Sequence, residues 1–101
     1  MKIKDIRNGM EKIEVVGRIS HKGKSTIVDT RFGLARVTVA TIEDETGSVG
    51  LNLWSDQIQK VREGDYVKLE GASARAYGGQ IKLNLVGENA KITLLNQNPF
   101  L

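Results

Sequence analysis

The chain has 101 residues, of which 40% are hydrophobic and 27% charged, and its formal net charge is +3. This length fits one domain with a modest core of its own. Cysteine is absent and His21 is the only histidine, which excludes a disulfide framework and a metal site of thiolates or several histidines. No apolar run approaches the ~20 residues of a membrane span, and no signal peptide is visible, so we expect a cytoplasmic protein.

The positive charge is concentrated in one segment, residues 21–36. Outside this segment, basic and acidic residues are equal in number. The segment contains a single acid, Asp29, and four basic residues: Lys22, Lys24, Arg31 and Arg36. A local basic loop attracts a polyanion even when the total charge is small. The alternative is an ordinary solvated loop.

The first third of the chain changes from a helical to an extended pattern. Apolar residues at helical spacing within residues 3–10 predict a short turn of helix that closes one end of the domain. Alternation of apolar and polar residues predicts a strand over 12–20. Polar residues and glycines over 21–33 predict a long loop. A segment rich in Val, Thr and Ile predicts the second strand over 34–44.

The middle of the chain continues this pattern. Residues 45–48 form a tight connection that ends in Gly-Ser, and residues 49–54 alternate as a third strand. A short helix is expected over 56–61. A Glu-Gly-Asp turn at 63–65 then leads into the next strand.

The fourth strand, residues 66–77, has two apolar phases. Val67 and Leu69 stand at odd positions and Ala72 and Ala74 at even ones, so we predict a bulge at Gly71. A Gly-Gly hairpin turn at 78–79 precedes the fifth strand over 80–85. Residues 92–95 form a last short strand or an apolar tail. We assign residues 1–95 to one domain and 96–101 to a frayed C-terminal tail.

Five strands with one short helix between the third and fourth are typical of the oligonucleotide-binding (OB) fold. This fold is an all-β, partly open five-stranded Greek-key barrel. The main competitor is an SH3-like barrel, which usually lacks that helix. The second strand is apolar on both parities, so its register stays open and Arg36 and Thr38 face either a groove or solvent.

Catalytic patterns are missing. His21 has no evident acid partner for a triad, and Asp44 and Glu45 are adjacent in an extended segment and point to opposite faces. The sequence has neither a phosphate-loop nor a dinucleotide-binding glycine motif. We therefore expect no enzymatic activity, no cofactor and no metal.

A binding surface is better supported, because the outer faces of three strands combine two aromatic rings with cations and amides. These faces carry Asn52 and Trp54, then Ser73, Arg75 and Tyr77, then Gln80, Lys82 and Asn84. Aromatic faces stack on unpaired bases while cations follow phosphates. The alternative is that Trp54 packs under the helix and Tyr77 closes the barrel.

Four spaced motifs resemble the archaeal single-stranded DNA-binding proteins and the OB domains of replication protein A. Residues 44–54, DETGSVGLNLW, are similar to the family run D-x-T-G-x-[VI]-x-[LIV]-x-[LV]-W. Residues 61–67 (VREGDYV), 77–83 (YGGQIKL) and 8–10 (NGM) resemble its later turn, its hairpin and its opening segment. The resemblance covers about residues 3–86 of this sequence.

This resemblance implies an OB fold that binds single-stranded DNA by stacking, in replication, recombination or repair. Trp54 and Tyr77 match two stacking positions, whereas Ser73 stands where the family usually has a third aromatic residue. Arg75 partly compensates, and Phe32 supplies another ring or anchors the loop in the core.

Two other functions stay open at this stage. The loss of an aromatic residue at Ser73 also fits an OB module that binds a protein partner. RNA binding is the other possible function, because OB grooves accept both sugars and no residue here is identified as contacting the 2′-hydroxyl that distinguishes RNA from DNA. We expect a monomer with no membrane partner.

Overall fold

The computed structural model describes residues 1–101. Its elements in chain order are η1 (Ile3–Asp5), β1 (Ile13–Lys22), β2 (Thr26–Thr30), β3 (Gly33–Asp44), β4 (Gly47–Trp54), η2 (Ser55–Lys60), β5 (Tyr66–Tyr77), β6 (Gln80–Asn84) and β7 (Lys91–Leu95). Both η elements are single 3-10 segments. No helix has the length and apolar character needed to cross a membrane.

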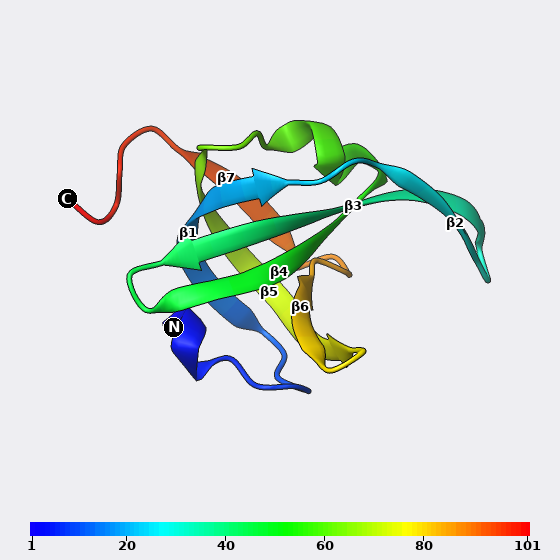
Figure 1. Cartoon of the computed structure of the whole chain (residues 1–101), viewed down its shortest axis with the longest axis horizontal. Coiled ribbons are helices and arrows are strands. Elements are labelled where there is room, and N and C mark those ends of the chain that lie inside the picture. The colour runs from blue at the N-terminus through cyan, green and yellow to red at the C-terminus, as the bar shows by residue number, and fades with distance from the viewer.

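Five strands close a ring of backbone pairings (Figure 1). β3 pairs with β1 and β4, β6 pairs with β4 and β5, and β1 pairs with β5. Only the β4–β6 pair is parallel. β2 pairs with β3 alone and β7 with β5 alone, so both lie outside the ring. The five strands of the ring are those predicted from the sequence.

The inside of this ring is the hydrophobic core. A single cluster of 17 buried hydrophobic residues fills it, mostly Val, Ile, Leu and Ala from alternate strand positions. Ile3 and Ile6 join the cluster from the η1 segment, so the N-terminal turn closes one end of the ring as predicted. Alternation therefore leaves the other side of each strand available for binding.

The prediction of a long loop over residues 21–33 was wrong. β1 continues to Lys22, and Thr26–Thr30 forms β2, which pairs antiparallel with the start of β3. β-branched residues in this segment favour extended structure, and Gly33 has the positive φ that the turn between β2 and β3 requires. Residues 23–37 form a hairpin that projects beyond the ring, and we call it the arm (Figure 1).

The structure also settles the register of β3. The expectation that Thr38 faces a groove or solvent was wrong, because Thr38 is buried with Ala40 and Ile42. Val39 is exposed and lies opposite Asn52 of β4. The Thr38 hydroxyl is 2.7 Å from that of Ser25, which satisfies its polar group inside the domain. The apolar residues of β3 at odd positions, such as Val39, therefore lie on the outer face of the ring.

The predicted bulge at Gly71 is confirmed. Ile13 of β1 pairs with Ala72, but Val15 pairs with Leu69, so β5 contains one extra residue between these pairs. Gly71 has φ +70°, and a Cβ there would lie 2.5 Å from the backbone oxygen of Asn89. The bulge lets both apolar phases of β5 face the core.

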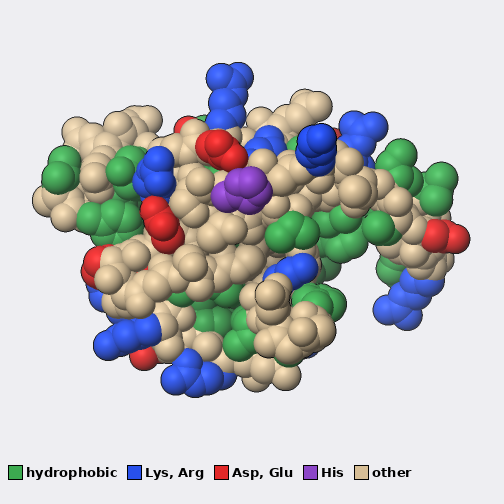
Figure 2. Space-filling view, viewed as in Figure 1, with side chains coloured by type: hydrophobic (Ala, Val, Ile, Leu, Met, Phe, Trp, Pro, Cys, Tyr) green, Lys and Arg blue, Asp and Glu red, His purple; other side chains and the backbone are tan.

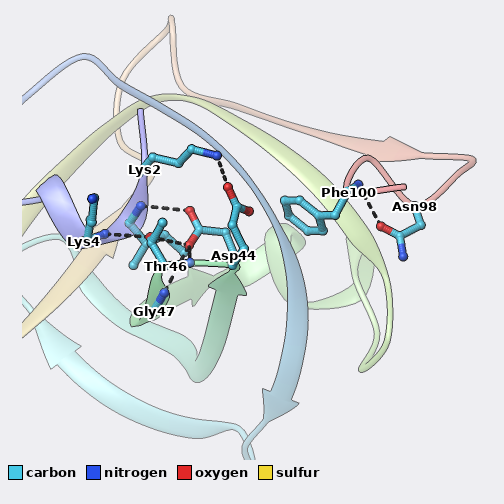
Figure 3. Close-up of polar contacts among 9 residues, drawn as sticks. Lys2, Lys4, Asp44, Thr46, Gly47, Asn98 and Phe100 are labelled. Carbon is cyan, nitrogen blue, oxygen red and sulfur yellow. Dashed lines mark hydrogen bonds and ion pairs between the residues drawn. The ribbon is translucent and has the colours of Figure 1, made fainter.

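Asp44 fixes the turn between β3 and β4 (Figure 3). Its Oδ1 accepts hydrogen bonds from the Thr46 N–H (2.7 Å), the Thr46 hydroxyl (2.6 Å) and the Gly47 N–H (3.2 Å). Its Oδ2 accepts one from the Ile3 N–H at 2.9 Å, which ties η1 to the turn. Partial burial by itself raises the pKa of Asp44, but these hydrogen bonds outweigh it and hold the pKa below its ordinary value.

The C-terminal tail contacts the domain near the same end. The Phe100 ring meets Tyr66 edge-on, with ring centroids 6.2 Å apart. The Phe100 N–H also donates to Oδ1 of Asn98 at 2.8 Å (Figure 3). The tail therefore lies away from the hairpin turn between β5 and β6 and leaves the outer face open.

Candidate nucleic-acid interface

Strand pairing brings the three predicted outer faces together. Asn52 of β4 lies opposite Asn84 of β6, which in turn lies opposite Ser73 of β5. In the same way Lys82 lies opposite Arg75, and Gln80 lies opposite Tyr77. We call this surface the aromatic face; it comprises Asn52, Trp54, Ser73, Arg75, Tyr77, Gln80, Lys82 and Asn84.

Hydrogen bonds join the two rings of the aromatic face. Oδ1 of Asn84 accepts hydrogen bonds from the Trp54 indole Nε1–H (3.3 Å) and from Nδ2 of Asn52 (3.1 Å). Nδ2 of Asn84 donates to the Tyr77 hydroxyl at 3.2 Å. Tyr77 is 48% exposed, whereas Asn52 and Asn84 are only 8% and 6% exposed. The two amides are thus buried, the Tyr77 ring is exposed to solvent, and the Trp54 ring is partly exposed.

The backbone around Trp54 is held as well. The Trp54 N–H donates to Oε1 of Gln57 at 3.0 Å, and Nε2 of Gln57 donates to the Leu85 carbonyl at 2.9 Å. Gln57 belongs to η2, so the short helix positions the end of β4. Trp54 is half-buried.

The two cations of the aromatic face differ in their interactions with the rest of the protein. Arg75 donates to the Ala74 carbonyl at 3.1 Å and lies 3.4 Å from the Glu11 carboxylate. Lys82 has no ion-pair partner, and its stem crosses β4 at Gly50, where an added Cβ would lie 2.9 Å from Lys82 Cγ. Lys82 therefore has a free ammonium group, whereas the guanidinium of Arg75 is paired with Glu11.

A groove of about 580 Å³ runs beside the aromatic face. Val39 and Thr41 of β3 form one wall, and Gln80 and Lys82 of β6 contribute to the other. Figure 2 shows hydrophobic side chains exposed where the arm leaves the body of the molecule. The sequence reading missed Val39 and Thr41, because only the register of β3 reveals which parity faces outward.

The arm carries the remaining predicted residues except Lys22. Phe32, at its tip, is 89% exposed, and the Arg31 guanidinium lies 5.3 Å from the ring centroid. Phe32 therefore does not anchor the arm in the core. Lys24 and Arg36 are exposed as well, and Arg36 has the parity of Thr38, opposite to that of Val39. Hydrophobic side chains also gather on the arm (Figure 2).

Lys22 differs from the other cations of this segment. Its ammonium group donates to the backbone carbonyls of Ile58 and Val61, the latter at 2.9 Å. These carbonyls belong to the end of η2, where helical carbonyls lack intrahelical partners. Lys22 thus fastens η2 to β1, and its charge is engaged within the protein.

The surface has the chemistry of a binding site. No group of three or more His, Cys, Asp or Glu side chains is arranged to hold a metal ion. Rings, amides and cations on a curved sheet beside a groove are the elements that OB folds use for oligonucleotides.

Comparison with known proteins identifies the class first. The solution structure of a replication factor A related protein from Methanobacterium thermoautotrophicum superposes with TM-score 0.78 at 25% identity, over 95% of this chain and 90% of that one. The OB domain of a Thermoplasma acidophilum protein superposes with TM-score 0.82 at 22% identity, over 97% of this chain and 88% of that one. The predicted OB fold is thus confirmed.

The family follows from the sequence. The family described as single-stranded DNA binding protein Ssb-like, OB fold, matches residues 9–94. The single-stranded DNA binding protein Ssb of Saccharolobus solfataricus is 31% identical over 99 residues, which cover 98% of this chain and 66% of that protein. The chain belongs to the Ssb-like OB-fold family, as its motifs predicted.

Proposed function

We propose that this domain binds single-stranded DNA through the aromatic face. The observation that carries the proposal is the placement of Trp54 and Tyr77 on one face, joined through Asn84. The family and the printed function of the S. solfataricus relative support it.

Stacking supplies the affinity in this proposal. Each base stacked on an aromatic ring contributes about 1–3 kcal/mol and any base has a face to stack, so binding tolerates different sequences. Duplex DNA hides those base faces, which favours single strands. Ser73 supplies no ring, so we expect two principal stacking positions instead of three.

Phosphate contacts supply the salt dependence. Lys82 and Arg75 lie opposite one another on β6 and β5, between the two rings in strand register. We expect them to neutralise successive phosphates, with Gln80 donating hydrogen bonds at the hairpin end. Each phosphate neutralised on a single strand adds about 0.7 to the slope of log K against log salt. Lys24, Arg31 and Arg36 of the arm add longer-range attraction.

The test is a titration with a dT oligonucleotide that follows intrinsic fluorescence at two salt concentrations. Trp54 is the only tryptophan, so the signal reports on one proposed stacking site. We expect strong quenching that weakens as salt rises. The role that we propose for this binding is non-enzymatic and lies in replication, recombination or repair. An unchanged signal from folded protein would contradict the proposal, and competition by a U oligonucleotide measures whether RNA binds equally well.

The arm favours a second candidate, a site for a protein partner. Phe32 and Leu34 are 89% and 77% exposed, and Ile27 is exposed beside them. Light scattering across concentrations tests whether this apolar surface associates with a second copy. We expect a constant monomer mass. In that case the arm could bind only a different protein and not a second copy of this chain.

A further inference from the structure

The amide of Asn84 links the two rings of the aromatic face. Its oxygen accepts from the Trp54 indole (3.3 Å) and from Asn52 (3.1 Å), and its nitrogen donates to the Tyr77 hydroxyl (3.2 Å). An amide offers two acceptor sites and two donor hydrogens. Both acceptor sites and one donor of Asn84 are therefore used inside the protein.

The position of Asn84 explains why it can do this. It is the last residue of β6, with Asn52 of β4 opposite it on one side and Ser73 of β5 on the other. Trp54 ends β4, which runs parallel to β6, so it lies at the same end as Asn84. Tyr77 pairs with Gln80 at the start of β6, and its side chain brings the hydroxyl to Asn84. The hydrogen bonds of Asn84 are the only ones that connect these two side chains.

A buried amide of this kind restricts the rings that it contacts. An indole or phenol on a strand has two side-chain torsions, and ligand binding must fix them. The amide of Asn84 is itself fixed by Asn52, so it sets the orientation of both rings before a ligand arrives. A hydrogen-bonded network of this type couples its members more strongly than separate pairs.

We propose that Asn84 is a positioning residue that holds Trp54 and Tyr77 in one arrangement ready for two bases. The proposal rests on the proposed function, because it concerns the geometry of the same stacking site. Asn84 acts through the rings and not by reading a base, since it is 6% exposed and its oxygen is occupied twice.

Two variants separate this role from a general loss of structure. Asn84→Ala removes all three hydrogen bonds, and Tyr77→Phe removes only the bond to Tyr77 while keeping the ring. We expect the affinity for a dT oligonucleotide to fall about tenfold for Asn84→Ala and about threefold for Tyr77→Phe. The double variant should lose no more than Asn84→Ala alone, because both changes break the same contact.

A spectroscopic measurement reports on the contact without DNA. The NMR signal of the Trp54 indole N–H should move in Asn84→Ala, because its acceptor is gone, and stay in place in Asn96→Ala. Asn96 is exposed after β7 and serves as the matched control. If Asn84→Ala does not fold, Tyr77→Phe decides the question.

The outcomes distinguish two failures. If the folded wild-type protein binds no oligonucleotide, the proposed function fails and this inference with it. If the wild-type protein binds and Trp54→Ala weakens binding, but Asn84→Ala and Tyr77→Phe each change affinity less than twofold, only the positioning role fails. Full additivity of the two changes would overturn it as well.

Discussion

The aromatic face and the arm both carry rings and cations, yet they are built differently. Trp54 and Tyr77 are held by Asn84, and the backbone of Trp54 is held by Gln57. Phe32 on the arm is 89% exposed, and the Arg31 guanidinium lies 5.3 Å from its ring centroid. Both rings of the aromatic face are hydrogen-bonded within the protein, whereas the Phe32 ring projects into solvent.

This difference matters for binding, because ordering a free side chain costs about 0.5–1.5 kcal/mol. A stacked base returns about 1–3 kcal/mol, so an unsupported ring loses much of its gain. The aromatic face should therefore set the affinity for single-stranded DNA, and the arm should mainly attract it through charge.

The largest expected effect is at Trp54. Trp54→Ala removes a supported ring and should weaken binding to a dT oligonucleotide by about 1–3 kcal/mol, or roughly 5- to 150-fold. Fluorescence anisotropy of a labelled oligonucleotide measures it. Trp54→Phe keeps a ring and loses the indole hydrogen bond, so its affinity should lie between those of the wild type and Trp54→Ala. Equal affinities of Trp54→Ala and the wild type would place the interface elsewhere.

A change at the turn between β3 and β4 should alter stability and not affinity. In Asp44→Asn, an amide nitrogen replaces one of the oxygens that accept the Ile3, Thr46 and Gly47 donors, so unfolding free energy should fall by about 1–3 kcal/mol. Urea unfolding measures it, and Asp29→Asn on the exposed arm is the control. A loss of affinity in the folded Asp44→Asn protein would contradict a purely structural role.

The same residue predicts a pH dependence. Because the folded-state pKa of Asp44 is lowered, its stabilisation is complete above the unfolded-state pKa of about 4. It disappears as the pH falls through the lower folded-state pKa. The stability difference between wild type and Asp44→Asn should thus be constant at neutral pH and shrink in acid.

The arm should give a smaller effect. Phe32→Ala should weaken binding less than about threefold, because ordering the ring offsets most of its stacking. Its exposure means that stability should not change, and Leu34→Ala is the matched apolar control. A loss as large as that of Trp54→Ala would show that the arm is an equal part of the interface.

The smallest effect concerns Arg75. Glu11 competes with phosphate for its guanidinium, so Glu11→Gln should strengthen binding about twofold, as expected for an exposed ion pair. Glu14→Gln removes the same charge from a pair with Lys68, away from Arg75, and controls for net charge. An equal gain in both variants would assign the effect to overall charge.

Sequence reasoning recovered the ring of five strands because its signals are local. Alternating apolar residues, turn glycines and the phase change around Gly71 each depend on a few neighbours. It placed Trp54, Tyr77 and Asn84 on one face for the same reason. The β2 strand was missed because it lies outside the ring and none of its residues is buried, so its sequence carries no alternation between core and solvent.

Contacts between distant residues were beyond the sequence. The Lys22 charge was assigned to a basic loop, but the fold brings it to the carbonyls of Ile58 and Val61. The hydrogen bonds of Asn84 depend on the parallel pairing of β4 and β6, which no local pattern predicts. Val39 could be assigned to the groove only from the register of β3 in the structure.

An NMR titration of the ¹⁵N-labelled protein with a dT oligonucleotide tests the proposed interface most directly. We expect the largest shifts at the Trp54 indole N–H and at amides of β4, β5 and β6 around Tyr77 and Lys82. Smaller shifts should occur on the arm, and almost none at η1 and β7. Shifts confined to the arm, with the Trp54 indole unmoved, would contradict the claim that the aromatic face is the interface.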